Sequence, residues 1–129
     1  MVQALNQTAL VTGASTGIGA VYADRLAHRG YDLILVARDA ARMEALADRL
    51  RGETGRNVDV MRADLTDRAD LAQVAGRFAA ERAITLLVNN AGLSMTGDAL
   101  SVDPSEIERI VALNIAAPTV LAGAAGKAF

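Results

Sequence analysis

Residues 8–19 read TALVTGASTGIG, a short apolar run that ends in a loop with three glycines. The run favours β-structure and predicts a strand over residues 8–12. From Gly17 onward, a helical spacing of three and four residues predicts a helix over residues 17–29, carried by Ile18, Val21, Tyr22, Arg25 and Leu26. Strand, glycine loop and helix N-terminus in this order form a place where anions bind, because glycines let backbone N–H groups approach a diphosphate and the helix end adds about half a positive charge.

The glycine loop also offers the hydroxyl groups of Ser15 and Thr16 as hydrogen-bond donors. Its spacing, Gly-x-x-x-Gly-x-Gly, differs from the Gly-x-Gly-x-x-Gly fingerprint of dinucleotide-binding proteins. Since junctions of strand, glycine and helix are common as plain turns in α/β proteins, the loop alone leaves a purely structural role open.

The alternation of strand and helix continues along the chain. Further strands are predicted over residues 31–37, 57–62 and 84–88, with helices between them that begin after Asp39 and Asp67. Residues 84–88 (ITLLV) are almost entirely apolar, which is typical of a strand covered on both faces. A last helix is predicted from Pro104, after the capping residue Asp103, to about residue 128, with a bend near Pro118 where a backbone donor is missing.

Repeated strand–helix units of this kind predict a parallel sheet with helices on both faces, since parallel strands need crossover connections. The expected fold class is therefore a doubly wound α/β fold, a Rossmann-like three-layer α/β/α arrangement that stops after the fourth strand and its following helix. At 129 residues, one domain over residues 1–129 is expected.

The amino-acid composition excludes several classes of protein and of functional site. The chain is 52% hydrophobic with a net charge of −2, which does not fit a disordered protein. The absence of cysteine excludes disulfides, a thiol nucleophile and cysteine-ligated zinc, and no metal site is predicted; the single histidine, His28, lies near a helix end, where an exposed or capping role is usual. The 13 Lys and Arg residues are dispersed, so no nucleic-acid partner is expected.

Two further stretches of the sequence predict where in the cell the protein is located. Residues 1–7 have no signal-peptide pattern, so a cytoplasmic location is expected. The most apolar stretch, residues 110–125, is interrupted by Asn114 and Pro118 and is shorter than the ~20 residues that a membrane span needs, which predicts a buried helix and no membrane association.

A second motif, NNAG at residues 89–92, follows the fourth strand at its carboxyl end, the edge of a parallel sheet where ligands bind. Together with the loop at residues 12–19, about 70 residues earlier, it closely resembles the short-chain dehydrogenase/reductase family. The resemblance covers essentially the whole chain but only about the first half of the family fold.

The resemblance implies that the glycine loop holds the pyrophosphate of NAD(H) or NADP(H), and that the NNAG motif braces the sheet beside the adenine ribose. Asp64 and Leu65 match the adenine contact of the family, in which the carboxylate accepts from the exocyclic amine. Asn114 matches a helix asparagine that supports a proton-relaying water, and it falls on an apolar stripe, where a buried amide must be hydrogen-bonded.

The end of the second strand favours NADP(H) over NAD(H). Ala37 occupies the position where NAD-selective enzymes of this class carry an acidic residue for the ribose 2′-OH. Arg38 is a planar, permanently charged donor of the kind that a phosphate prefers. Asp39 could also reach the hydroxyl but is expected to cap the next helix. The predicted cofactor-binding residues are Gly13, Ser15, Thr16, Gly17, Ile18, Gly19, Arg38, Asp64, Leu65, Asn89, Ala91 and Gly92.

The family's acid/base pair is missing. Neither Tyr22 nor Tyr31 has a lysine four residues later, the only lysine is Lys127, and the strand that carries the catalytic serine is also absent. Asn114 is therefore the only predicted catalytic-site residue, and the chain alone is expected to be inactive. The simplest account is a piece of a longer oxidoreductase that transfers hydride between NADP(H) and a small carbonyl or alcohol substrate.

Two alternatives remain. The chain could be a non-catalytic dinucleotide-binding or sensor module, or an assembly segment. Strand 84–88 would lie at an open sheet edge, and the helix from Pro104 would lack its usual cover, which promotes association. A homo-oligomer formed through this helix is expected.

Overall fold

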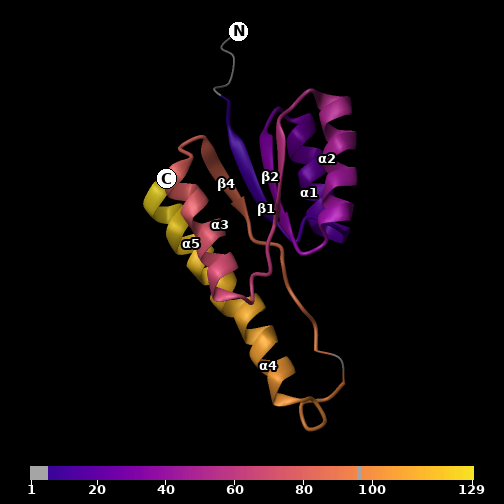
Figure 1. Cartoon of the computed structure of the whole chain (residues 1–129), viewed down its shortest axis with the longest axis vertical. Helices are drawn as coiled ribbons and strands as arrows, with labels where there is room; N and C mark the ends of the chain where they lie inside the picture. The colour runs from indigo at the N-terminus through magenta and orange to yellow at the C-terminus, as the bar shows by residue number, and fades with distance from the viewer. Residues whose placement is uncertain (1–5, 96) are drawn as a thin grey trace.

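The computed structural model describes residues 6–95 and 97–129. These residues form a four-stranded parallel sheet with the order β3-β2-β1-β4 (Figure 1). The strands are β1 (Thr8–Thr12), β2 (Asp32–Ala37), β3 (Val58–Arg62) and β4 (Ile84–Val88); the connecting helices are α1 (Gly17–His28), α2 (Ala40–Thr54) and α3 (Arg68–Ala80). The predicted doubly wound α/β fold is confirmed.

The sheet has one apolar core on each face, because successive side chains of a strand point to opposite sides. Ala9 and Val11 of β1 pack with α1 and α2 on one face, while Leu10 packs with α3 and the last helix on the other. Phe78 of α3 is 1% exposed, and burial of such a side chain contributes roughly 2–3 kcal/mol.

The α1 helix is confirmed, but its large side chains do not face the core. Its buried residues are Gly19, Ala23, Leu26 and Ala27, whereas Ile18, Val21 and Tyr22 are 68%, 55% and 48% exposed. The small residues face the sheet because a Cβ on Gly19 would overlap the carbonyl oxygen of Gly13. Close packing of the helix on the loop therefore selects small side chains over large ones.

Strand β4 is less covered than its apolar sequence predicted. Ile84 is buried, Thr85 is exposed, and Leu86, Leu87 and Val88 are half-buried. The reason is its place at the sheet edge, where β1 is its only strand neighbour among the described residues. The prediction of cover on both faces was wrong, and that of an open edge is confirmed.

The last helix consists of α4 (Pro104–Val111), a π-helical turn over Ala112–Ala116, and α5 (Ala117–Ala128). The π turn lies just before Pro118, where the sequence predicted a bend. Pro118 has no N–H, and its ring crowds the carbonyl four residues earlier. A wider turn relieves that crowding, and the Ala117 N–H donates instead to the Ala112 carbonyl.

The prediction that this helix is buried was wrong. Its buried residues are Ala117, Leu121 and Ala125, whereas Ile107, Val111, Ile115 and Val120 are 41–60% exposed. The α4 half extends beyond the end of the sheet (Figure 1). By length and composition alone the 25-residue run Pro104–Ala128 could cross a membrane, which is weak information for a single helix.

The close packing of α1 on the glycine loop predicts that alanine substitutions at two helical glycines change the stability of the fold in opposite directions. We expect Gly19→Ala to lower the free energy of unfolding by roughly 2–4 kcal/mol, because its Cβ would overlap the Gly13 carbonyl. The matched control is Gly76→Ala in α3, where a Cβ has no neighbour within 4 Å; it should stabilise the fold by about 0.4–1 kcal/mol. Urea unfolding followed by circular dichroism measures both, and equal effects would contradict the packing argument.

Candidate functional site

A cleft of about 430 Å³ opens at the carboxyl edge of the sheet. Its walls come from the loops after all four strands and from α4, so segments far apart in sequence meet there. The predicted residues that line it are Gly13, Ser15, Thr16, Gly17, Ile18, Arg38, Asp64, Leu65, Ala91 and Gly92. Gly19, Asn89 and Asn114 are outside this lining.

The glycine loop leaves the N-terminus of α1 uncapped. The helices α2, α3 and α4 each begin with an aspartate whose side chain accepts a backbone N–H bond, whereas Thr16 at the start of α1 makes no such bond. The first turn of α1 also contains no acidic residue. Backbone donors and the positive end of the helix dipole therefore remain available to an anion.

The loop glycines have different roles. A Cβ on Gly13 would lie 2.9 Å from the Ala91 Cα, so Gly13 lets the two loops touch; its φ of +65° adds a second reason for glycine. Gly17 has a φ of +57° and nothing within 4 Å of the position its Cβ would occupy. Open space at the helix end is what an approaching ligand requires.

Thr12 and Asn90 connect the two loops. The Thr12 hydroxyl accepts hydrogen bonds from the N–H groups of Asn90 and Ala91, both at 3.0 Å, and donates to the Val88 carbonyl at 3.4 Å. The Asn90 side-chain amide donates to the Gly13 carbonyl at 3.2 Å. The sequence singled out the NNAG motif but not Asn90 itself, which lines the cleft and positions the glycine loop.

Arg38 is exposed at the end of β2 and makes no hydrogen bond or ion pair with residues 6–95 and 97–129. Asp39 accepts from the Arg42 backbone N–H at 3.1 Å, which confirms its predicted role as the cap of α2. Asp39 lines the cleft, but its carboxylate is engaged with Arg42, whereas the Arg38 guanidinium is available.

Asp64 has one engaged and one available oxygen. Its Oδ1 accepts from the Thr66 hydroxyl at 2.6 Å and from the Thr66 N–H at 3.0 Å, and its Oδ2 makes no hydrogen bond with the described part of the chain. The Thr66 hydroxyl bond, then the Thr66 N–H, and then the charges of Arg38 and Arg109 lower the pKa of Asp64. The carboxylate is ionised at neutral pH and presents Oδ2 as an acceptor.

Asn114 is exposed, contrary to the prediction of a buried amide. It lies in the π turn. Its amide is nevertheless engaged at both ends: the Leu93 N–H donates to Oδ1 at 2.8 Å, and Nδ2 donates to the Leu93 carbonyl at 2.7 Å, which leaves one N–H and one lone pair for other partners. Asn89 lies outside the cleft and donates to the Pro118 carbonyl at 3.1 Å. Both asparagines hold the last helix to the loop after β4.

Sequence reasoning missed the wall that α4 contributes. Arg109 and Leu113, one helical turn apart on the same face, line the cleft together with Thr66. Helical periodicity marks which residues share a face but not that this face meets a cleft built by loops far earlier in the sequence. No signal in the sequence distinguishes Arg109 from an ordinary surface arginine.

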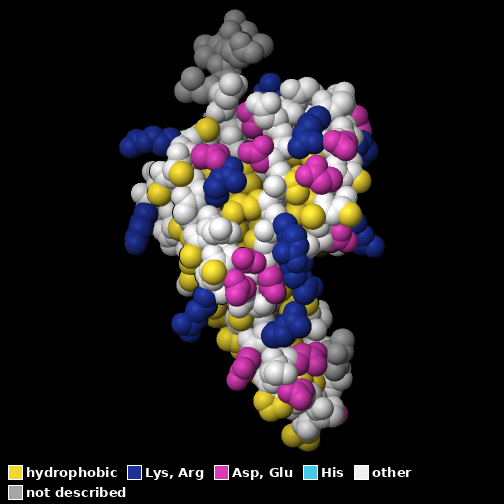
Figure 2. Space-filling view, in the orientation of Figure 1, with side chains coloured by type: hydrophobic (Ala, Val, Ile, Leu, Met, Phe, Trp, Pro, Cys, Tyr) yellow, Lys and Arg dark blue, Asp and Glu magenta, His cyan; other side chains and the backbone are white. Residues whose placement is uncertain are grey.

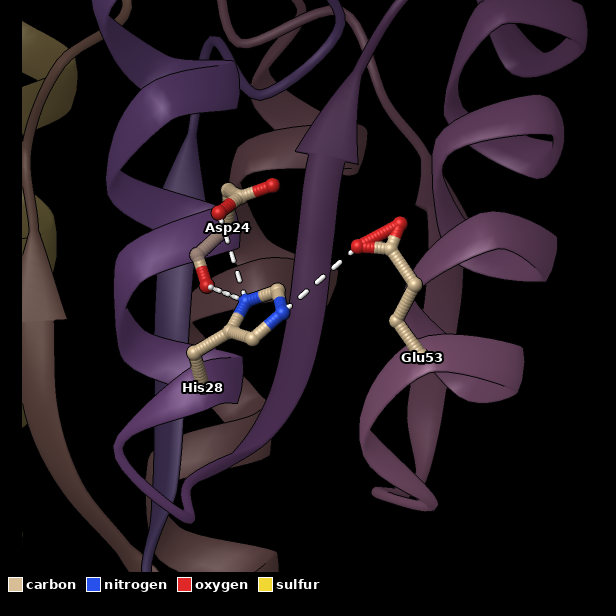
Figure 3. Close-up of side chains that lie close together, drawn as sticks. All are labelled: Asp24, His28 and Glu53. Atoms are coloured by element: carbon tan, nitrogen blue, oxygen red, sulfur yellow. Dashed lines mark hydrogen bonds and ion pairs between the residues drawn. The ribbon is translucent and has the colours of Figure 1, made fainter.

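A separate cluster links α1 to α2. Asp24, His28 and Glu53 place potential metal-ligand atoms within 4.8 Å of one another, and the His28 ring points toward both acidic groups (Figure 3). Arg49 already donates to Asp24 and Glu53 at 2.9 Å each, and these hydrogen bonds raise its pKa. His28 is exposed, as predicted, and its Nδ1–H donates to the Asp24 carbonyl at 2.8 Å. The cluster joins two helices and takes no part in the cleft.

Known proteins resemble the chain along nearly its full length. A family model described as short chain dehydrogenase matches residues 7–129. Human 17-beta-hydroxysteroid dehydrogenase type 3 is 33% identical over 115 residues, covering 88% of this chain and 37% of the relative. Two solved structures are each 50% identical and cover 94% of this chain and 48% of their own. They are a bulky-bulky ketone specific alcohol dehydrogenase from Comamonas testosteroni (TM-score 0.93) and a short-chain dehydrogenase from Sphingobium yanoikuyae in complex with NADPH (TM-score 0.92).

The hydrogen bonds of the Thr12 hydroxyl predict that removing the hydroxyl lowers the stability of the fold more than removing the methyl group does. Thr12→Val keeps the shape but leaves the Ala91 N–H without an acceptor among the described residues, while the Asn90 N–H keeps the Val88 carbonyl at 3.1 Å. We expect a loss of roughly 1–3 kcal/mol in the free energy of unfolding. Thr12→Ser keeps the hydroxyl and should lose only about 1 kcal/mol for the missing methyl group. Amide hydrogen exchange at Ala91 should accelerate in the valine variant alone; unchanged exchange there would refute the hydroxyl's role.

The Asp64–Thr66 contact predicts a pH dependence. Because the folded-state pKa of Asp64 is lowered, its contribution to stability is present above the ordinary carboxyl pKa of 3.8 and is lost as the pH falls through the folded-state value. Thr66→Val removes the strongest cause, so the pKa of Asp64 should rise and this acid-dependent loss should shrink. Carbon-13 NMR titration of the Asp64 carboxyl measures the shift. Thr119→Val, which removes a hydroxyl bonded to Ile115, serves as the control; an equal shift there would contradict the assignment.

Proposed function

The chain belongs to the short chain dehydrogenase family, and from this premise we propose that it is the NADP(H)-binding domain of an oxidoreductase acting on a carbonyl or alcohol substrate. NADPH, when bound, supplies the hydride that such a reduction needs. The observation that carries the proposal is the uncapped N-terminus of α1, which opens on the same cleft as Arg38 and Asp64.

The glycine loop is proposed to bind the pyrophosphate. The proposal rests on the N-terminus of α1, which no side chain caps, and on the open space beside Gly17. Ser15, Thr16 and Ile18 line the cleft, and the two hydroxyl groups add donors. Gly19 lies outside the lining, in the first turn of α1. Ala91 and Gly92 form the opposite wall, which Asn89 supports from outside through Pro118.

The adenine is proposed to lie against Asp64 and Leu65. The free Oδ2 of Asp64 is an acceptor suited to an exocyclic amine, and the ionised state of the carboxylate strengthens such a bond. Leu65 and Leu113 both line the cleft and supply apolar surface for a ring.

The preference for NADP(H) over NAD(H) is proposed from Ala37 and Arg38. Ala37 offers no carboxylate to a ribose hydroxyl, and Arg38 has no hydrogen-bond or ion-pair partner among the described residues. A guanidinium binds phosphate through parallel, charge-assisted hydrogen bonds. The 50% identical structure from Sphingobium yanoikuyae contains NADPH, which supports the same choice.

Activity of the whole protein is part of the proposal, because the chain spans half or less of the length of three curated relatives that it matches. Residues 1–129 contain neither a Tyr-x-x-x-Lys pair nor the strand that carries the catalytic serine of the family. We therefore propose that this stretch alone binds the coenzyme without turning over substrate. Asn114 is its only proposed catalytic-site residue, as a support for a proton-relaying water.

Assembly is a second proposal. Ile107, Val111, Ile115 and Val120 are exposed along one helix, and exposed apolar side chains of this kind favour association. We propose a homo-oligomer formed through the helix from Pro104, in a cytoplasmic protein without membrane or nucleic-acid partners. Basic and acidic side chains are interspersed on the face shown in Figure 2, which suits that expectation. A purely non-catalytic dinucleotide sensor remains the alternative to the enzyme.

The coenzyme proposal is tested by titrating the purified protein with NADPH and NADH in a calorimeter. Arg38→Ala should weaken NADPH about 10- to 100-fold, since it removes a charged contact to the 2′-phosphate, and should leave NADH within about twofold. Arg29→Ala, an exposed arginine at the end of α1, is the control and should change neither. Equal losses for both coenzymes in Arg38→Ala would refute the phosphate contact, and no binding by the unmodified protein would refute the proposed function.

A further inference from the structure

The cleft contains a second arginine that comes from an unexpected element. Arg109 projects from α4 and lines the cleft together with Arg38, Asp64 and Leu65. It is exposed, and it makes no hydrogen bond or ion pair with residues 6–95 and 97–129. Arg42, Arg49, Arg51, Arg56 and Arg77, by contrast, all form ion pairs with acidic side chains.

The position of α4 places Arg109 on the side of the cleft where residues 64–66 lie. A neighbouring groove is lined by Leu65 and Thr66 on one side and by Ile107 and Val111 of α4 on the other, so the helix runs beside this segment. Leu113 lies one turn after Arg109 on the same face and also lines the cleft. Arg109 therefore shares the cleft with two leucines, Leu65 and Leu113.

The charges of the cleft support a ligand role for this arginine. Asp64 introduces a negative charge into a cleft that is proposed to accept a nucleotide with several phosphates. Arg38 and Arg109 both act on that carboxylate through their charges, without a direct ion pair. Asp39 also lines the cleft, but its carboxylate is paired with Arg42. The two unpaired guanidinium groups of Arg38 and Arg109 therefore offset the repulsion between Asp64 and an anionic ligand.

We propose that Arg109 is a coenzyme-binding residue that contacts the adenine ring, and that the 2′-phosphate is left to Arg38. The inference rests on the proposed function and assigns a residue of the same site. A guanidinium is planar and stacks on aromatic faces, and the two leucines of the cleft offer the ring an apolar surface. Arg109 thus adds affinity for every adenine coenzyme, whereas Arg38 distinguishes the phosphorylated one.

The test compares Arg109→Ala with the unmodified protein by calorimetric titration with NADPH, NADH, ADP and adenosine 2′,5′-bisphosphate. We expect affinity for all four to fall by a similar factor of roughly three- to tenfold. Arg109→Lys keeps the charge but not the planar group and should recover only part of the loss. Arg82→Ala is the matched control, an exposed arginine outside the cleft, and should change none of the four.

The outcomes separate the two proposals. A loss confined to NADPH and the bisphosphate would mean that Arg109 binds the 2′-phosphate, and unchanged affinity for all ligands would mean that it binds nothing; either result overturns the inference. Failure of the unmodified protein to bind any of the four would overturn the proposed function instead. Circular dichroism melting of each variant checks folding, and Arg109→Ala should melt with the unmodified protein because the side chain has no partner within the described residues.

Discussion

The contact between the loops after β1 and β4 is the constraint on which the rest of the site depends. Gly13 approaches Ala91 so closely that a Cβ would lie 2.9 Å from its Cα, and the Thr12 hydroxyl accepts both N–H groups that begin the second loop. Gly19 then lets α1 pack on the Gly13 carbonyl. These contacts fix where the positive end of α1 points, and thus where an anion can be held.

Capping and charge divide the helices into two kinds. An aspartate satisfies the first turn of α2, α3 and α4, so their N-termini are complete without a ligand. The N-terminus of α1 lacks such a group and faces the cleft, where Arg38 and Arg109 add positive charge and Asp64 supplies an acceptor. The first-turn backbone N–H groups that bond to aspartate side chains in α2, α3 and α4 are therefore left for a ligand in α1.

Local features of the sequence predicted the strands and helices well, because apolar runs, glycine turns and aspartate caps act over a few residues. Strands β1 and β4 were placed at the observed residues, and the caps Asp39 and Asp67 were confirmed. Burial was predicted less well, since it depends on neighbours distant in sequence. The exposed residue Ile18 and the half-covered strand β4 show this, and Arg109 was missed for the same reason.

The last helix shows how one proline can change which face a residue occupies. Ile107 and Ala125 are 18 positions apart, which is five turns of a regular α-helix, so a uniform helix would place them on the same face. The π turn before Pro118 inserts an extra residue and rotates α4 by about 100° relative to α5. Ala125 is buried while Ile107 is exposed, consistent with this rotation and with the extension of α4 beyond the sheet. The hydrogen bonds of Asn89 to Pro118 and of Asn114 to Leu93 hold the rotated helix in place, and the face that it turns to the cleft is the one that carries Arg109 and Leu113.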